Sequence, residues 1–221
     1  YPACNLKISC GIYVMAEDTI SDAIDIANSA RKESKKNGSH NAVVYDHAAL
    51  KELSRYRIEE QDANLALQEK RVTFFLQPKV SLLTGKIVGA EALARRLGKD
   101  GSIVYPDTFL QLLEANGSIV NLDFQIFEQV CSFLSDRLKN DLPVVRTSVN
   151  LSRLHIQNTE AAEILHSIAQ KYQIPPNYIE FELTETILLN EFAGAKDFID
   201  RLRGYQYHVS IDDFGAGYAG I

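Results

Sequence analysis

Strand-forming and helix-forming segments alternate along most of this chain, and the alternation limits the folds that it can adopt. Beyond residue 71, segments with period-two patterning are separated by segments whose apolar residues have helical spacing. The predicted strands are 72–77, 87–95, 144–151, 178–183 and 207–212, and the predicted helices are 106–115, 122–138, about 159–172 and about 191–203. This order predicts an α/β fold with a mostly parallel sheet, either doubly wound or closed into a barrel.

The last three predicted strands each separate an apolar side from a polar side. The polar sides carry Arg146, Ser148 and Asn150, then Glu180 and Glu182, then His208, Ser210 and Asp212. If helices cover the apolar sides, the polar sides face one shared interior. An interior with so many carboxylates is unfavourable unless a cation lies in it.

The strand 87–95 adds another carboxylate, Glu91, which shares one side of the strand with Arg95. Both sides of this strand are expected to be covered, so an unpaired Glu91 would be costly or would shift its pKa. An ion pair between Glu91 and Arg95 is the simplest partner arrangement. A site shared with the other strands is the alternative.

Five oxygen-donor side chains lie at or near the carboxyl ends of predicted strands, where barrels and open sheets build their active sites. They are Glu91, Asn150, Glu182, Asp212 and Asp213. A ligand set without Cys or His favours Mg²⁺ or Mn²⁺ over Zn²⁺, with Ca²⁺ as the remaining alternative. Adjacent aspartates can bridge two ions roughly 3.5–4 Å apart, as in phosphodiester cleavage. Unrelated ion pairs and helix caps are the alternative interpretation.

The histidines are not expected to supply the chemistry. His155 and His166 are isolated in the sequence. His208 shares the side of Asp212, but a buried, hydrogen-bonded role fits it better than a catalytic one.

Five motifs, in order along the chain, match those of the EAL domain. They are Gln77-Pro78, Glu91-Ala92-Leu93-Ala94-Arg95, Ser148-Val149-Asn150-Leu151-Ser152, Glu182-Leu183-Thr184-Glu185 and Asp212-Asp213-Phe214-Gly215-Ala216-Gly217-Tyr218. The resemblance implies a (β/α)₈ TIM-type barrel whose first strand is antiparallel to the others. It also implies hydrolysis of cyclic di-GMP to linear pGpG with Mg²⁺ or Mn²⁺, Ca²⁺ being a non-productive occupant.

The resemblance assigns roles residue by residue. Glu91, Asn150, Glu182, Asp212 and Asp213 match the family's metal ligands, with Asp213 as the bridging ligand between two ions. Gln77 and Arg95 match substrate contacts, and a guanidinium can bind a phosphate through two hydrogen bonds.

Glu185 matches the residue that holds the glycine-rich loop after Asp213, although a carboxylate favourable to a helix N-terminus is the alternative. That loop departs from the family pattern. It has Ala216 and Ala219-Gly220 where threonine and two serines are commonest. These differences affect the ordering of the loop and any contact that the loop makes, including the contact of a homodimer through the barrel.

The region from Arg71 to Ile221 has 151 residues, whereas a (β/α)₈ barrel has about 250. We therefore expect three further strand–helix units beyond Ile221, with the lysine and the general-base glutamate that the resemblance implies. Two functions stay open: a metal-dependent phosphodiesterase, and a non-catalytic receptor or scaffold that binds cyclic di-GMP.

Residues 1–46 form a predicted strand–helix–strand unit that is too small to be a domain. It resembles the C-terminal end of a GGDEF domain, with Asn28 where an aspartate is usual and without the signature loop, so cyclase activity does not carry over. Residues 47–70 contain no Gly or Pro and predict a connecting helix, which leads into the barrel portion at 71–221.

Composition excludes several other classes of protein. A net charge of −6 argues against a surface for DNA or RNA polymers but allows a local basic pocket for a small anion. No apolar run approaches the roughly 20 residues of a membrane span. Cys4 and Cys10 are too far apart on one strand for a disulfide, so a reduced, cytoplasmic location is expected. The chain begins with Tyr1, so a start upstream, with a tether to the membrane there, is compatible with this.

Overall fold

The computed structural model of the protein describes residues 8–16, 18–36, 42–184 and 192–212. The chain divides into two compact units, one up to Glu59 and one from Glu60 onward. Helix α2 (His47–Gln68) contains this boundary and agrees with the helix predicted at 47–70. None of the helices in these ranges is long and apolar enough to cross a membrane.

The first unit is the predicted strand–helix–strand. Strand β1 (Gly11–Tyr13) pairs in parallel with β2 (Val43–Tyr45), and helix α1 (Ile20–Lys36) connects them. Helix and strand approach closely at Gly11, where a Cβ atom would lie only 2.3 Å from the carbonyl oxygen of Ala27. Only glycine permits this contact.

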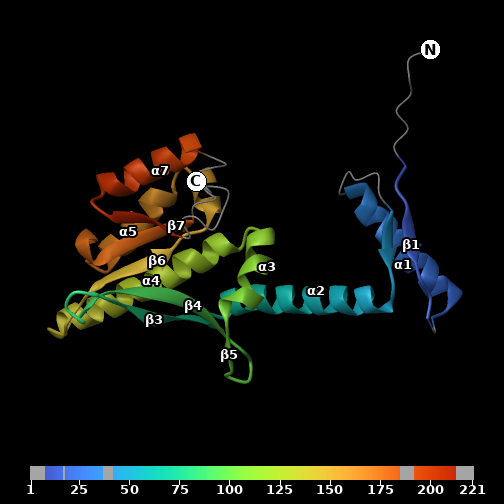
Figure 1. Ribbon diagram of the computed structural model, residues 1–221, viewed down its shortest axis with the longest axis horizontal. Coiled ribbons are helices and arrows are strands. Elements are labelled where there is room, and N and C mark those ends of the chain that lie inside the picture. Colours follow the sequence, from blue (N-terminus) through green and yellow to red (C-terminus); the bar gives the residue numbers. More distant parts are fainter. Residues whose placement is uncertain (1–7, 17, 37–41, 185–191, 213–221) are drawn as a thin grey trace, which may run out of the picture. The chain divides into compact units, whose positions relative to one another are not determined.

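The second unit is built on a six-stranded mixed sheet (Figure 1). Its strands are β3 (Val72–Val80), β4 (Ile87–Leu97), β5 (Ile103–Val104), β6 (Arg146–Asn150), β7 (Ile179–Thr184) and β8 (His208–Asp212). The order is β3-β4-β6-β7-β8, with β5 paired to β4. Strand β3 is antiparallel to β4, and β4, β6, β7 and β8 are parallel. The predicted α/β fold with an antiparallel first strand is confirmed.

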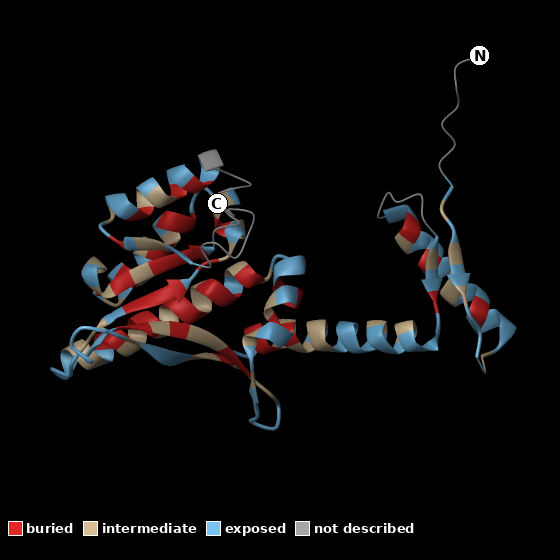
Figure 2. Cartoon of the chain, in the orientation of Figure 1, coloured by how far each residue is buried: buried red, intermediate tan, exposed pale blue. Residues whose placement is uncertain are grey.

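Helices cover the apolar face of this sheet. They are α3 (Leu110–Ala115), α4 (Ile119–Lys139), α5 (Ala161–Lys171) and α7 (Phe192–Gly204), with short 3₁₀ segments at Pro106–Thr108, Arg153–Gln157 and Pro176–Tyr178. Helix α4 packs on β3, β4 and β6, α7 packs on β8, and α5 contacts both helices. The buried residues of these helices and strands form one core, seen as the red segments in Figure 2.

Three local features differ from the sequence predictions. The strand predicted at 72–77 continues through Pro78 to Val80, which is compatible with a position at the edge of the sheet. The helix predicted at 106–115 is a 3₁₀ turn followed by α3. The strand around Glu91 is covered on both sides only in its middle, since Ile87 and Val88 at its start are 57% and 59% exposed.

Helices α2, α4, α5 and α7 are each followed by a non-glycine residue in the left-handed conformation. These residues are Lys70, Asp141, Gln173 and Gln206, with φ between 52° and 68°. The next backbone N–H then bonds to a carbonyl in the last turn of the helix, as from Tyr207 to Leu202 at 3.2 Å. This turn reverses the chain and, at Gln206, leads directly into strand β8.

The second half of α2 belongs to the core of this unit. Ala63, Ala66 and Leu67 are buried. Asp62 forms ion pairs with Arg96 of β4 and, at 3.1 Å, with Arg71. The helix is therefore attached to the sheet by both apolar and charged contacts.

The contact between Phe127 of α4 and Phe181 of β7 joins helix layer and sheet, with ring centroids 5.1 Å apart and both side chains fully buried. We expect Phe127→Ala to lower the free energy of unfolding by about 3–5 kcal/mol because it leaves a cavity. Chemical denaturation of the full-length protein measures this. Leu82→Ala is the control: this leucine is fully exposed, so its change should be within about 0.5 kcal/mol, and equal effects would contradict the predicted core.

Candidate functional site

The strand register places the predicted polar residues on one face of the sheet. Glu91 lies opposite Ser148, Asn150 opposite Glu182, and Thr184 opposite Asp212. Residues that lie opposite one another on neighbouring strands point to the same face, and so do alternate residues of one strand. The four carboxylate and amide side chains therefore share the face that the helices leave uncovered.

Three carboxylates meet on this face. Glu91, Glu182 and Asp212 each have an oxygen, and these three atoms all lie within 4.8 Å of one another. Glu182 is buried, Glu91 is half-buried and Asp212 is exposed. Such a set of oxygen donors fits a hard divalent cation.

Asn150 joins the cluster through Glu91. Its Nδ2 donates a hydrogen bond of 2.8 Å to Oε1 of Glu91. The amide oxygen of Asn150 is then available to accept a bond or bind a cation. The simpler expectation, in which Glu91 pairs with Arg95, is not what the structure has, since Arg95 uses other partners.

Arg95 is a buried guanidinium held by a carbonyl and two aromatic rings. Its Nη1 donates to the carbonyl oxygen of Ala94 at 2.7 Å. Its Cζ lies 5.4 Å from the ring centroid of Phe75 and 5.0 Å from that of Tyr105. Its Nε has no partner among the described residues. Arg95 therefore has spare donors for an anion, four residues beyond Glu91 on the same side of β4.

Gln77, the other predicted substrate contact, lies directly opposite Glu91 on β3, and its side chain is exposed. It therefore shares the polar face with the carboxylates.

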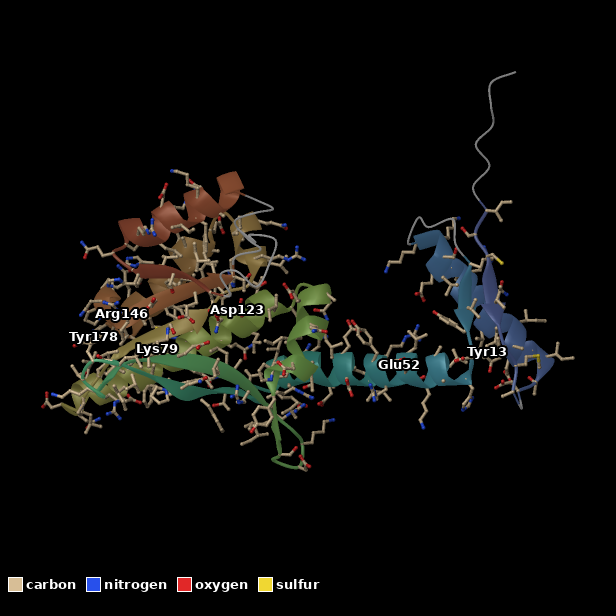
Figure 3. All side chains as sticks on the ribbon, in the orientation of Figure 1. Tyr13, Glu52, Lys79, Asp123, Arg146 and Tyr178 are labelled. Carbon is tan, nitrogen blue, oxygen red and sulfur yellow. The ribbon has the colours of Figure 1, made fainter. Side chains whose placement is uncertain are left out.

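Lys79 is a member of this site that the sequence reasoning missed. Its ammonium forms an ion pair with Oε1 of Glu182, and Figure 3 labels Lys79 on the sheet. Burial, the largest single influence, lowers the pKa of Lys79, but the hydrogen bond and charge of Glu182, with the charges of Glu180 and Glu91, outweigh it and raise that pKa. The sequence does contain a signal for this residue. Lys79 follows Gln77 by two positions on one strand, so the two side chains point to the same face.

A second missed feature holds the end of β6. Asp123 of α4, labelled in Figure 3, accepts hydrogen bonds from the backbone N–H of Ser152 and from Nε2 of His155, both at 2.9 Å. Burial raises the pKa of Asp123, against the lowering by its bond to His155. Because Ser152 follows Asn150 by two residues, this buried pair fixes the segment that presents Asn150.

Within the described part of the chain, His166 and His208 have no hydrogen bond to the cluster. Nδ1 of His166 is 3.0 Å from the hydroxyl of Tyr207, on the helix side. The expectation that His208 is buried is wrong. Its side chain is exposed because it lies on the same uncovered face as Thr184 and Asp212.

A cavity of about 270 Å³ adjoins Asn150. Its walls come mainly from apolar residues of β4, α3 and α4, among them Leu93, Leu110 and Ile119. The polar members are Glu114, Asp123, Asn150, Ser152 and Thr184. It is large enough for a planar apolar group of a ligand. Asp213, Glu185, Ala216 and Ala219-Gly220, which the sequence also singled out, lie outside the described residues.

Comparison with known families agrees with this geometry. Residues 60–221 match the family model described as "EAL domain". The chain belongs to the EAL domain family. The matched region begins where the second compact unit begins, so the EAL portion and the structural unit coincide.

Two curated proteins are similar in sequence to this chain. "Probable cyclic di-GMP phosphodiesterase PdeB" of Escherichia coli K12 is 35% identical over 159 residues, which cover 71% of this chain and 30% of that protein. "Cyclic di-GMP phosphodiesterase NbdA" of Pseudomonas aeruginosa is 24% identical over 97% of this chain and 28% of its own length. The chain thus spans less than a third of the length of these curated relatives.

The EAL fold is also found in solved structures. "PaMucR Phosphodiesterase, c-di-GMP complex" aligns with a TM-score of 0.68 and 25% identity, over 73% of this chain and 66% of that one. The mixed sheet with its antiparallel first strand is therefore part of an EAL barrel.

Removal of the Asp123 carboxylate tests the support of Asn150. In Asp123→Ala, the N–H of Ser152 and the ring of His155 lose their buried acceptor, which we expect to lower the free energy of unfolding by about 1–3 kcal/mol. Chemical denaturation checks this. Asp136→Ala is the matched control, an exposed aspartate on the same helix, and a loss of the same size in both variants would show that the buried pair is unimportant.

Proposed function

We propose that the protein is a divalent-metal-dependent phosphodiesterase that hydrolyses cyclic di-GMP to linear pGpG. The observation that carries this proposal is the convergence of Glu91, Glu182 and Asp212, with Asn150 bonded to Glu91, on one face of the sheet. The names of the EAL relatives and the neighbour with c-di-GMP support the choice of substrate.

The donor set fits Mg²⁺ or Mn²⁺. Three carboxylates whose oxygens lie within 4.8 Å, and an amide oxygen, match the ligands that these ions prefer, and they include no thiolate or imidazole. We propose Glu91, Asn150, Glu182 and Asp212 as ligands, with Asp213 bridging a second ion and Glu185 holding the following loop. When bound, such ions activate water and neutralise charge on a phosphate. Ca²⁺ would fill the same ligands non-productively.

The remaining residues would bind and orient the substrate. Arg95 has unused donors in a buried position where a phosphate can accept two hydrogen bonds. Gln77 offers an amide opposite Glu91. The apolar cavity beside Asn150 can take a base and exclude water from part of the ligand. The hydrogen bond from Asn150 orients the Glu91 carboxylate relative to these groups.

A non-catalytic receptor or scaffold is the second candidate. It is favoured by the way α2 enters the domain, because the ion pair between Asp62 and Arg96 links this helix to the residue next to Arg95. For either function we also propose that residues 1–46 are the end of a GGDEF-like domain and that 47–70 connect it to the EAL portion. We propose further that the protein is cytoplasmic and that the barrel forms a homodimer.

Replacement of Glu91 separates hydrolysis from binding. Glu91→Gln keeps the shape of the side chain and its acceptor for Asn150 but removes a negative charge from the ligand set. We expect turnover of cyclic di-GMP by the full-length protein to fall to background, while calorimetric binding in Ca²⁺ is largely retained. Chromatography of pGpG formed with Mg²⁺ or Mn²⁺ measures turnover.

Glu52→Gln, an exposed position on α2, should keep the parent rate. Parent-like turnover by Glu91→Gln would refute the ligand assignment. A parent protein that binds cyclic di-GMP without hydrolysing it would move the protein to the receptor class.

Arg95→Ala should act on substrate capture. Loss of a charged hydrogen bond to phosphate is expected to weaken binding of cyclic di-GMP by about 1.5–3 kcal/mol. Calorimetry in Ca²⁺ measures the dissociation constant directly. Arg203→Ala on the exposed side of α7 serves as the control, and equal affinities of the two variants would exclude Arg95 as a contact.

A further inference from the structure

Lys79 approaches the carboxylate cluster from the end opposite Arg95. On β3, Gln77 lies opposite Glu91, whereas Lys79 lies opposite Gly89. Gly89 precedes Glu91 by two residues on β4. The backbone of Lys79 therefore lies nearer the amino ends of the parallel strands than that of Gln77. The substrate-binding end of the site, with Arg95, lies in the other direction along β4.

The stem of this lysine runs alongside the opposing glycine. A Cβ atom at Gly89 would be in ordinary van der Waals contact with it, 3.7 Å from Cβ and 3.8 Å from Cδ of Lys79, and would lie 3.2 Å from the carbonyl oxygen of Arg146. The stem reaches the side chain of Glu182, which is only 8% exposed. The ammonium is therefore bound to the most buried carboxylate of the cluster.

From this geometry we infer that Lys79 sets the metal affinity of the site, because its ammonium and a divalent ion use the same carboxylate, Glu182. This inference rests on the proposed metal-dependent function. A positive charge on Glu182 weakens the attraction of the cluster for a dication, since each unit charge a few ångströms away opposes binding. The ion must share Glu182 with Lys79 or displace it.

The same arrangement couples the ion to the substrate. Lys79 cancels part of the negative charge of the carboxylates that attracts the ion. A phosphate of the substrate, bound near the ions, restores negative charge to the site. Ion and substrate should therefore each bind more tightly when the other is present, by the same factor. Lys79 thus acts as a positioning and charge-compensating residue rather than as a catalytic one.

The inference is tested by titrating the full-length protein with Mn²⁺ in the absence of substrate and measuring the affinity by calorimetry. We expect Lys79→Met to bind Mn²⁺ about tenfold more tightly than the parent or better, because removal of the ammonium destabilises the metal-free cluster and leaves Glu182 to the ion. Lys79→Arg keeps the charge and should bind like the parent. Lys139→Met, at the exposed end of α4, is the matched control and should also be unchanged.

Thermal unfolding gives a second readout that does not depend on activity. Lys79→Met should have a lower Tm than the parent without metal, and saturating Mn²⁺ should raise its Tm by more than it raises that of the parent. If Lys79→Met does not fold, Lys79→Gln takes its place. Parent-like or weaker Mn²⁺ binding by the neutral variant, with the parent binding Mn²⁺ normally, would overturn the role of Lys79 alone. Failure of both parent and variant to bind Mn²⁺ would overturn the metal-dependent function as well.

Discussion

The register of the parallel strands is the constraint on which the candidate site depends. Asn150 lies opposite Glu182, and Thr184 lies opposite Asp212. A slip of one residue in any strand would turn its polar side chains toward the helices and its apolar side chains away from them. The buried residues on the other face, such as Val149, Phe181 and Leu183, specify the register through the free energy of burial. The core thus positions the carboxylates.

Gathering carboxylates on one face costs electrostatic free energy, and the structure offsets this cost with cations at both ends of the cluster. Lys79 binds Glu182 from nearer the amino ends of the parallel strands. Arg95 lies toward the carboxyl end of β4, where Phe75 and Tyr105 stack on it without neutralising it. A guanidinium in contact with aromatic rings keeps its charge and its donors for an incoming anion. The face therefore has one cation bound to the cluster and another available to a ligand.

The supports of the site come from elements that are distant in the sequence. Asp123 on α4 bonds to Ser152 and His155 and so fixes the segment after Asn150. Asp62 on α2 bonds to Arg96, the neighbour of Arg95. Both carboxylates connect a helix to a strand end that carries a site residue. Helices α2 and α4 are thus both linked to the site by charged contacts.

The sequence by itself determined which segments are strands and which of their side chains share a side, because period-two alternation depends only on neighbours along the chain. It thereby predicted that Glu91, Asn150, Glu182 and Asp212 share a face, and the motifs carrying these residues identified the family. Tertiary structure decided the partners. The contact of Lys79 with Glu182 spans 103 positions in sequence and depends on the order of the strands in the sheet. The Asp123–His155 pair likewise depends on how α4 packs, and the exposure of His208 depends on which face the helices leave uncovered. Alternation fixes the direction of a side chain, but only packing determines what it meets.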